Sequence, residues 1–212
     1  MQTLQQRDPD LSVIIPVYDL ERFLAPMLDT LKAQRLGDYQ VEIIFVLNNC
    51  TDHSEDVIRA SGLDCQVISC SIQGCGPARN EAMDIARGRW IWFMDGDDWL
   101  MADTAIKDAL DLCTAEDLEL LRIPFASNRF NYQYFSMVWQ YVMRRDYIDE
   151  FRFPAIQPAE DDAFMDAVLN KAGLNQWTYL YLLPHLPYAA YYYNYLREGS
   201  NMYRVTMLGE KI

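Results

Sequence analysis

Residues 90–98 read WIWFMDGDD, an apolar run that ends abruptly in three carboxylates. A strand of this composition belongs in a core, and three like charges at its end are costly unless a cation neutralises them. Mg²⁺ and Mn²⁺ take oxygen ligands and commonly bridge to substrate phosphates. The stretch therefore predicts a buried strand with a metal–diphosphate site at its end. The alternative is a solvated turn that caps the next helix.

Strand and helix patterns alternate on both sides of this stretch. Short β-branched runs predict strands, and apolar residues at helical spacing predict helices. The predicted strands cover residues 11–17, 41–47, 65–72, 90–94 and 118–124, and the predicted helices cover residues 20–34, 51–61, 74–88 and 103–115. This alternation indicates an α/β fold with a mainly parallel sheet and helices on both faces. Such sheets bind ligands at the carboxyl ends of their strands, where Asn48, Gly74–Gly76 and Asp95 are expected to meet.

The second half of the chain is less regular and rich in aromatic residues. These residues gather at 130–148 and in the tyrosine-rich stretch 188–195. Glu160, Asp161 and Asp162 precede an apolar helical pattern, and the helix dipole alone favours acidic residues in a first turn. No repeat, linker or boundary stands out, so the 212 residues are expected to form one domain.

Composition narrows the class of protein. The net charge of −13 argues against a general nucleic-acid binder, whose surface would be basic. Five cysteines without a CxxC pair, together with two histidines, favour free buried thiols over a structural zinc site. The N-terminus lacks an apolar signal region, and no run approaches the ~18 apolar residues of a membrane span. The expected location is the cytoplasm.

Four segments in a fixed order carry a resemblance to a known family. They are SVIIPVY at 12–18, RN at 79–80, FMDGDD at 93–98 and EDDAF at 160–164. Each motif alone is weak, but in this order and strand context they resemble the family 2 glycosyltransferases of the GT-A fold. Segments 138–145 and 193–200 also look like later parts of bacterial members.

The resemblance spans residues 11–200 and implies a fold and an organisation. The GT-A fold is a Rossmann-like α/β arrangement with a mainly parallel central sheet flanked by helices. Here an irregular, aromatic-rich C-terminal acceptor region is expected to complete it. Residues 1–212 would form a single GT-A domain, in which residues 11–125 bind the nucleotide sugar and residues 126–212 supply the acceptor site and the catalytic base.

The resemblance also implies an activity. A sugar of hexosyl or N-acetylhexosaminyl type would pass from a nucleotide-diphosphate donor to a glycan or lipid-linked acceptor, with inversion and with Mg²⁺ or Mn²⁺ as cofactor. UDP-linked donors are expected first, and GDP- and dTDP-linked donors are the alternatives. The implied pathway is bacterial surface polysaccharide biosynthesis. Lipid-linked acceptors imply peripheral association with the inner face of the membrane, and no nucleic acid is expected as a partner.

The two acidic segments receive catalytic and metal-binding roles from the resemblance. Asp97 would hold the cation on the diphosphate, and Asp95 would contact the ribose or the water shell of the cation. Asp161 matches the catalytic base that accepts the proton of the acceptor hydroxyl. Glu160 would orient Asp161 or the acceptor.

Eight residues are expected to contact the nucleotide sugar: Pro16, Val17, Tyr18, Asn48, Arg79, Asp95, Gly96 and Asp98. Tyr18 would stack on the base, and Asp98 would reach the sugar hydroxyls or the cation. Arg79 would offer a planar charged donor to the nucleotide, although a helix-surface arginine is the plain alternative.

One departure from the family pattern concerns the nucleobase. The family usually carries an acidic pair near the end of the second strand, where this chain has Leu47 and Asn48. An asparagine amide can still pair with a base edge, but without a charge-assisted bond, which leaves the preference for uridine open. A catalytically weak nucleotide-sugar-binding protein of the same fold is therefore the alternative function. A different metal–phosphate enzyme ranks last.

One histidine and one aromatic segment each have more than one interpretation. His185, in a proline-rich loop, is either a metal ligand or a structural residue. Residues 139–145 fit an amphipathic membrane-surface helix, a wall of the acceptor site or plain core, and core is favoured.

Overall fold

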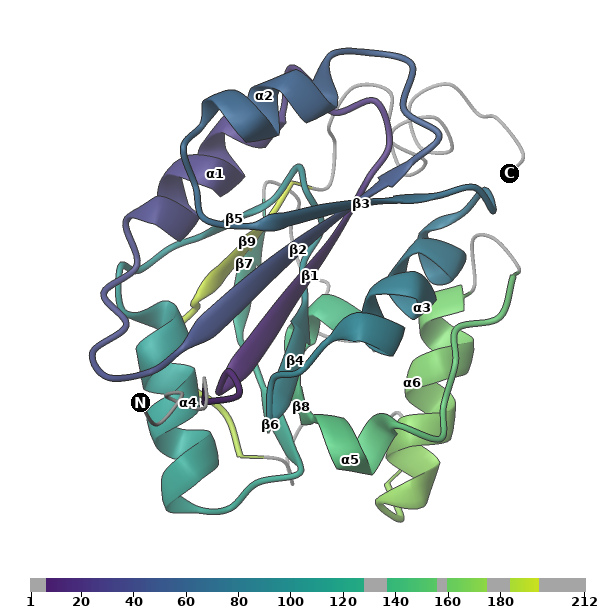
Figure 1. The fold of residues 1–212 in the computed structure, drawn as a ribbon. Helices are drawn as coiled ribbons and strands as arrows, with labels where there is room; N and C mark the ends of the chain where they lie inside the picture. The colour runs from purple at the N-terminus through teal and green to yellow at the C-terminus, as the bar shows by residue number, and fades with distance from the viewer. Residues whose placement is uncertain (1–6, 128–136, 156–159, 175–183, 195–212) are drawn as a thin grey trace, which may run out of the picture.

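The computed structural model describes residues 7–127, 137–155, 160–174 and 184–194. A six-stranded sheet in the order β3-β2-β1-β4-β8-β6 forms its centre (Figure 1). These strands are β1 (Leu11–Val17), β2 (Val41–Asn48), β3 (Gln66–Cys70), β4 (Trp90–Phe93), β6 (Leu120–Arg122) and β8 (Tyr141–Arg144). β1 to β4 pair in parallel, and β8 lies antiparallel between β4 and β6. The predicted α/β class with a mainly parallel sheet is confirmed.

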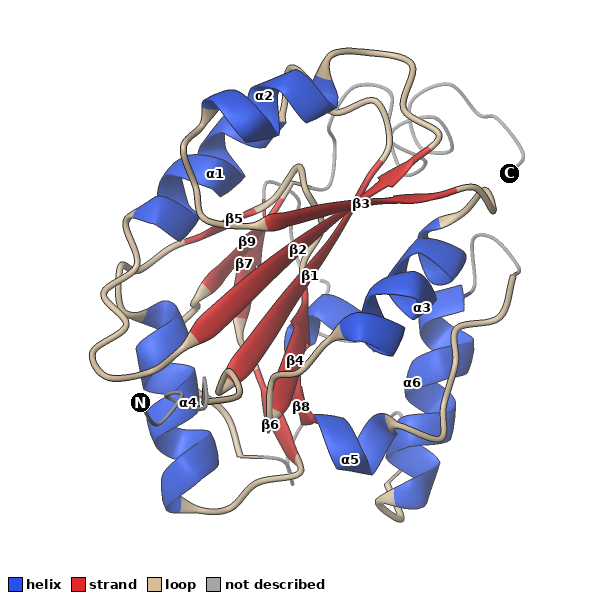
Figure 2. Ribbon diagram, in the orientation of Figure 1, coloured by secondary structure: helices blue, strands red, loops and turns tan. Residues whose placement is uncertain are grey.

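Helices cover both faces of this sheet (Figure 2). On one face lie α1 (Leu24–Lys32), α2 (Ser54–Ala60) and α4 (Ala105–Ala115), and on the other lie α3 (Cys75–Ile85), α5 (Arg145–Ile148) and α6 (Glu160–Lys171). Within the described ranges, no helix combines the length and apolar character needed to cross a membrane.

The burial of β1 explains its sequence. Val13 and Ile15 belong to the core under α1 and α4, whereas Ile14 belongs to the core under α3 and α6. A strand covered on both faces reads as a continuous apolar run, because neither side of the pleat meets water. The same reasoning applies to β2 and β4, so the apolar runs located these strands correctly.

A second sheet of three short strands was not predicted. It consists of β5 (Trp99–Leu100), β9 (Tyr191–Tyr193) and β7 (Phe125–Ser127), in the order β5-β9-β7. β9 brings part of the tyrosine-rich stretch next to the acidic loop that follows β4. Because β5 has only two residues, its pattern is too short to signal a strand.

Two predicted features differ from the structure. Residues 138–143 are buried, and they form a 3₁₀ turn (Val138–Gln140) followed by β8, so the surface-helix interpretation is wrong and the core interpretation holds. α3 ends at Ile85 rather than at Gly88. Gly88 instead permits close packing, since a Cβ there would lie 2.3 Å from the backbone nitrogen of Ser12. The five cysteines all fall within the described residues and form no disulfide.

Candidate functional site

Parallel pairing brings the predicted site segments to one edge of the sheet. Val17 pairs with Leu47, and Asn48 pairs with Cys70, so β1, β2 and β3 end at about the same level. The loop of residues 94–98, which follows β4 beside β1, lies at this edge too. Pro16 and Val17 are buried in β1, while Tyr18 is 51% exposed. Tyr18 is therefore accessible for stacking on a ligand ring.

Arg79 lies at the centre of the acidic groups. It is only 2% exposed, and the helix α3 carries it into the interior. Its Nη2 donates to Asp95 across 2.9 Å, and its Nη1 donates to Asp161 across 2.5 Å. The helix-surface interpretation of Arg79 is therefore wrong. This arginine connects the loop after β4 with the first turn of α6.

The environment of Arg79 keeps it charged. Burial by itself lowers the pKa of Arg79, but the neighbouring carboxylates of Asp161 and Asp95 outweigh burial and raise the pKa. The ring of Phe153 packs against the guanidinium, with 5.3 Å between the guanidinium carbon and the ring centre. A planar guanidinium can serve two carboxylates and an aromatic face at once, which an ammonium cannot.

Asp161 has the properties of a tuned acid–base group. Only 13% of its side chain is exposed, and burial raises its pKa to about 7, against the opposing effect of Arg79. Glu160 lies beside it, 3.8 Å from Nη1 of Arg79, and its Oε2 is buried with no hydrogen-bond partner among the described residues. A carboxyl with a pKa near neutrality is suited to exchange protons with a bound hydroxyl group.

The three carboxylates of the acidic loop have different environments. Asp95 and Asp97 are partly exposed, whereas Asp98 is fully buried. The two carboxylate oxygens of Asp98 accept hydrogen bonds from the Tyr191 hydroxyl and from the backbone N–H of Asn194. Burial, together with the charges of Asp97 and Asp95, raises the pKa of Asp98 well above its usual value. The expected contact of Asp98 with the sugar or the cation does not fit this position.

Packing explains why position 96 is a glycine. A Cβ at this position would lie 2.8 Å from Cδ1 of Leu20, so a larger residue would require the Leu20 side chain to shift. Whether its backbone contacts the nucleotide sugar stays a prediction.

Asn48 clamps a loop within the protein. Its Nδ2 donates to the carbonyl of Ile72 across 2.6 Å, and its Oδ1 accepts the backbone N–H of Gly74 across 2.8 Å. Gly74 has φ of 127°, which residues with a side chain rarely adopt, and α3 begins directly after it. Because both ends of the amide serve the backbone, the expected reading of the nucleobase by Asn48 does not fit this arrangement.

Asp95 and Asp97 fit a hard divalent cation. Both offer carboxylate oxygens at the edge of the sheet, the donor type that Mg²⁺ and Mn²⁺ prefer. The donor set therefore suits the expected cofactor. His185 is exposed and bridges through its backbone to Arg122, and within the described residues it joins no group of three potential metal ligands.

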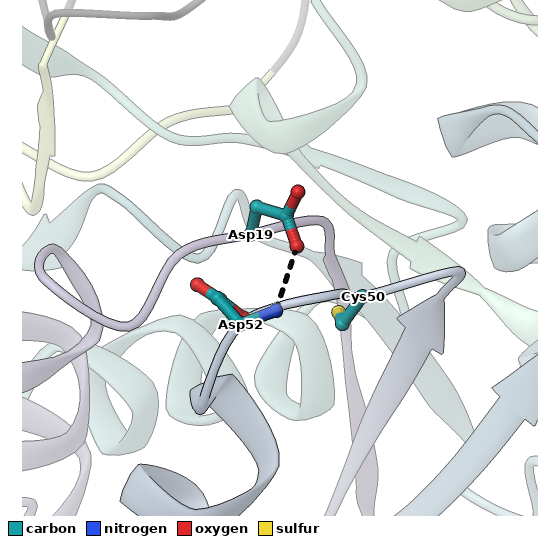
Figure 3. A group of neighbouring side chains, drawn as sticks. All are labelled: Asp19, Cys50 and Asp52. Carbon is teal, nitrogen blue, oxygen red and sulfur yellow. Dashed lines mark hydrogen bonds between the residues drawn. The ribbon is translucent and has the colours of Figure 1, made fainter.

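A second acidic group at the same edge was missed by sequence reasoning. Asp19, Cys50 and Asp52 have potential ligand atoms within 4.8 Å of one another (Figure 3). However, Asp19 accepts from the backbone of Thr51 and Asp52, and Asp52 accepts from the backbone of Glu21. These bonds join the loops after β1 and β2. The side chains therefore act as loop caps, a role that their turn-forming residue types favour.

The contacts of Tyr191 and Asn194 with the acidic loop were also missed. Each lies more than 90 residues from its partner, with separations of 93 residues for Tyr191 and Asp98 and 96 for Asn194 and Asp98. The tyrosine-rich composition of residues 188–195 was the only local signal for this region.

Comparison with protein-family models matches residues 12–165 to "Glycosyl transferase family 2". The chain is 26% identical over 212 residues to the uncharacterized glycosyltransferase EpsJ of Bacillus subtilis, covering 82% of this chain and 61% of EpsJ. It is 24% identical over 220 residues to the poly(ribitol-phosphate) beta-N-acetylglucosaminyltransferase TarS of Staphylococcus aureus, covering 90% of this chain and 36% of TarS.

Solved structures share the fold. A crystal structure of S. aureus TarS 1-349 in complex with UDP-GlcNAc matches with a TM-score of 0.78 and 22% identity, over 92% of this chain and 60% of that one. The mannosyltransferase PcManGT of Pyrobaculum calidifontis, in complex with GDP-Man and Mn²⁺, matches with a TM-score of 0.72 and 17% identity, over 94% and 61%. The chain thus spans less than two thirds of the length of these relatives.

Proposed function

Since the chain belongs to glycosyl transferase family 2, we propose that it transfers a sugar from a nucleotide-diphosphate donor to a glycan or lipid-linked acceptor, with inversion at the anomeric carbon. A surface polysaccharide or a poly(ribitol-phosphate) type of polymer is the proposed product, in keeping with relatives such as TarS. A UDP-linked hexose or N-acetylhexosamine is the first candidate donor, supported by the UDP-GlcNAc complex of TarS. GDP- and dTDP-linked sugars are the alternatives.

One observation carries this proposal: Arg79 joins Asp95 of the acidic loop to Asp161 of α6. Asp95 lies in the segment expected to hold the donor diphosphate, and Asp161 is the expected base. A transfer reaction needs the donor and the acceptor hydroxyl in fixed relative positions, which contributes strongly to rate. The shared arginine fixes the two carboxylates relative to each other.

The acidic loop is assigned to the donor diphosphate. Asp97 and Asp95 would hold Mg²⁺ or Mn²⁺, which, when bound, offsets the charge that develops on the leaving diphosphate. The deep burial of Asp98 leaves these two partly exposed carboxylates as the candidate ligands of the loop. Tyr18, exposed at the end of β1, is proposed to stack on the nucleobase.

Asp161 is assigned the role of general base. Its pKa of about 7 leaves a substantial ionised fraction at neutral pH and gives that fraction the basicity to remove a proton. As the acceptor oxygen attacks the anomeric carbon, Asp161 would take its proton. The buried Oε2 of Glu160, which has no partner in the described part of the chain, offers an acceptor for a second hydroxyl group of the incoming sugar.

The test is a thermal-shift screen followed by a turnover assay. UDP, GDP and dTDP are each added to the protein with and without Mn²⁺, because a ligand of the native state raises the melting temperature. The expected result is a cation-dependent rise for one nucleotide, followed by release of that nucleotide from its sugar conjugate. Binding without turnover on any acceptor tested would favour the catalytically weak binding protein, and the absence of any nucleotide effect would contradict both functions.

A further inference from the structure

We propose that Tyr191 is a positioning residue for the cation-binding loop: its hydroxyl fixes the loop of residues 95–98 so that Asp95 and Asp97 are held ready for a divalent cation. The proposal rests on the assignment of this loop to the donor diphosphate. It gives the second half of the chain a part in donor binding, in addition to supplying the base.

The hydroxyl of Tyr191 contacts both ends of the acidic loop. It accepts the backbone N–H of Asp95 across 3.0 Å and donates to Oδ2 of Asp98 across 2.6 Å. A backbone bond from the Asp98 N–H to the Asp95 carbonyl closes the same turn at 3.1 Å. One phenolic oxygen thus links the first and last residues of the loop, with Asp97 held between them.

Asn194 supports the loop from the same strand end. Its backbone N–H donates to Oδ1 of Asp98 across 2.8 Å, and its Nδ2 lies 3.4 Å from the Asp97 carbonyl oxygen. Beyond the loop, β5 pairs with β9 through Trp99 and Tyr192. The acidic loop and the residue after it are therefore attached to β9 and to Asn194 directly after it, through Asp95, Asp97, Asp98 and Trp99.

The ring of Tyr191 is itself held rigidly. It is fully buried and stacks on Trp139, with 4.9 Å between ring centres and 11° between ring planes. Trp139 in turn accepts a hydrogen bond at its carbonyl from Nε1 of Trp92, at 2.9 Å. Because the ring is buried and stacked in the core, its packing there sets the position of its hydroxyl.

Groups that orient metal ligands from outside the coordination shell contribute to metal affinity, typically 10–100-fold when they are removed. Tyr191 stands in that relation to Asp95 and Asp97. If Tyr191 only filled the core, removing its hydroxyl would leave Mn²⁺ affinity unchanged, because the ring would remain. The two roles therefore separate when the oxygen alone is removed.

The test compares Tyr191→Phe with Tyr192→Phe. Tyr192 is the neighbouring tyrosine of β9, and its ring stacks on Trp99 with 4.2 Å between ring centres, whereas the hydroxyl that contacts Asp95 and Asp98 belongs to Tyr191. Mn²⁺ binding is measured from the loss of the free Mn²⁺ electron paramagnetic resonance signal, with and without UDP, and circular dichroism checks the fold. The expected result is 10–100-fold weaker Mn²⁺ binding by Tyr191→Phe and wild-type binding by Tyr192→Phe.

Other outcomes are decisive as well. Wild-type Mn²⁺ affinity in a folded Tyr191→Phe variant would overturn the role of Tyr191 and leave the proposed function standing. Failure of the wild-type protein to bind Mn²⁺ under any of these conditions would overturn both. If Tyr191→Phe does not fold, amide hydrogen exchange of the wild-type protein decides the matter. Slow exchange at Asp95 and Asn194 supports the proposed role of Tyr191 in holding the acidic loop, and fast exchange at both overturns it.

Discussion

The Arg79 guanidinium and the Asp161 carboxylate form a buried ion pair between residues 82 positions apart in the chain. Neither side chain is more than 13% exposed. The same guanidinium also holds Asp95, so the donor loop and the proposed base share one cation. A single side chain thus contacts both the loop proposed to bind the donor and the proposed base.

Asp161→Asn tests the base. Asparagine keeps the shape of the side chain and its ability to cap α6, but it cannot take a proton. We expect transfer, followed as release of the nucleoside diphosphate in the presence of acceptor, to fall by roughly 10²–10⁴ while donor binding is kept. Asp162→Asn, in the same turn but exposed, is the control and should retain activity. Full activity of Asp161→Asn would reduce Asp161 to a residue that begins a helix.

The pH dependence of the protein should report the same group. The pKa of Asp161 is raised to about 7, so transfer should increase about tenfold per unit as pH rises toward that value. For stability the sign is opposite: the native state binds this proton more tightly than the unfolded state, so stability is lost as pH rises from about 4 to about 7. Urea unfolding across this range should show a smaller loss for Asp161→Asn, and an identical slope would contradict the raised pKa.

Arg79→Met should destabilise the protein strongly. Removing one member of a buried ion pair leaves the carboxylates of Asp95 and Asp161 without their cation, which typically costs about 3–5 kcal/mol. Arg152→Met is the matched control, since Arg152 pairs with Asp84 on the surface, where such pairs are worth about 0–1 kcal/mol. The free energy of unfolding from urea titrations compares the two. Similar losses in both variants would mean that the buried network is not important for stability.

Asn48→Asp distinguishes a loop clamp from a base-reading residue. A carboxylate would face the carbonyl oxygens of Cys70 and Ile72, which now accept from the amide, so we expect a loss of about 1–3 kcal/mol. Asn49→Asp, at an exposed neighbouring position, should be nearly neutral. A base-reading role predicts instead a gain in UDP affinity relative to GDP and dTDP. Ranking the three affinities before and after the change decides between the roles.

Asp97→Asn tests the cation site. Because Asp97 is partly exposed and adds repulsion to a cluster of carboxylates, its neutralisation should leave stability unchanged or slightly higher. Mn²⁺-dependent binding of the nucleoside diphosphate should weaken sharply in calorimetric titrations. The surface change Asp103→Asn is the control. If binding keeps its Mn²⁺ dependence and strength, Asp97 is not the ligand.

The sequence by itself determined the parallel α/β core and the segments that meet at its edge. β1, β2 and β4 are mostly apolar because both faces of the sheet are covered, and this makes their pattern readable without the structure. The acidic loop after β4 and the acidic start of α6 were located by the same reasoning, since strand ends and helix starts carry local signals.

Only the tertiary structure decided what these residues contact. Arg79 reads as a helix residue, yet its partners lie 16 and 82 positions away. In the sequence Asp98 cannot be told apart from its acidic neighbours, but in the structure it is buried and accepts a hydrogen bond from Tyr191, 93 positions later. The sequence suggests that the Asn48 amide could bind a ligand, but in the structure this amide accepts a hydrogen bond from the backbone N–H of Gly74. Local propensity reflects a residue and its near neighbours, whereas the partner of a buried polar group is fixed by which distant segments the fold packs together.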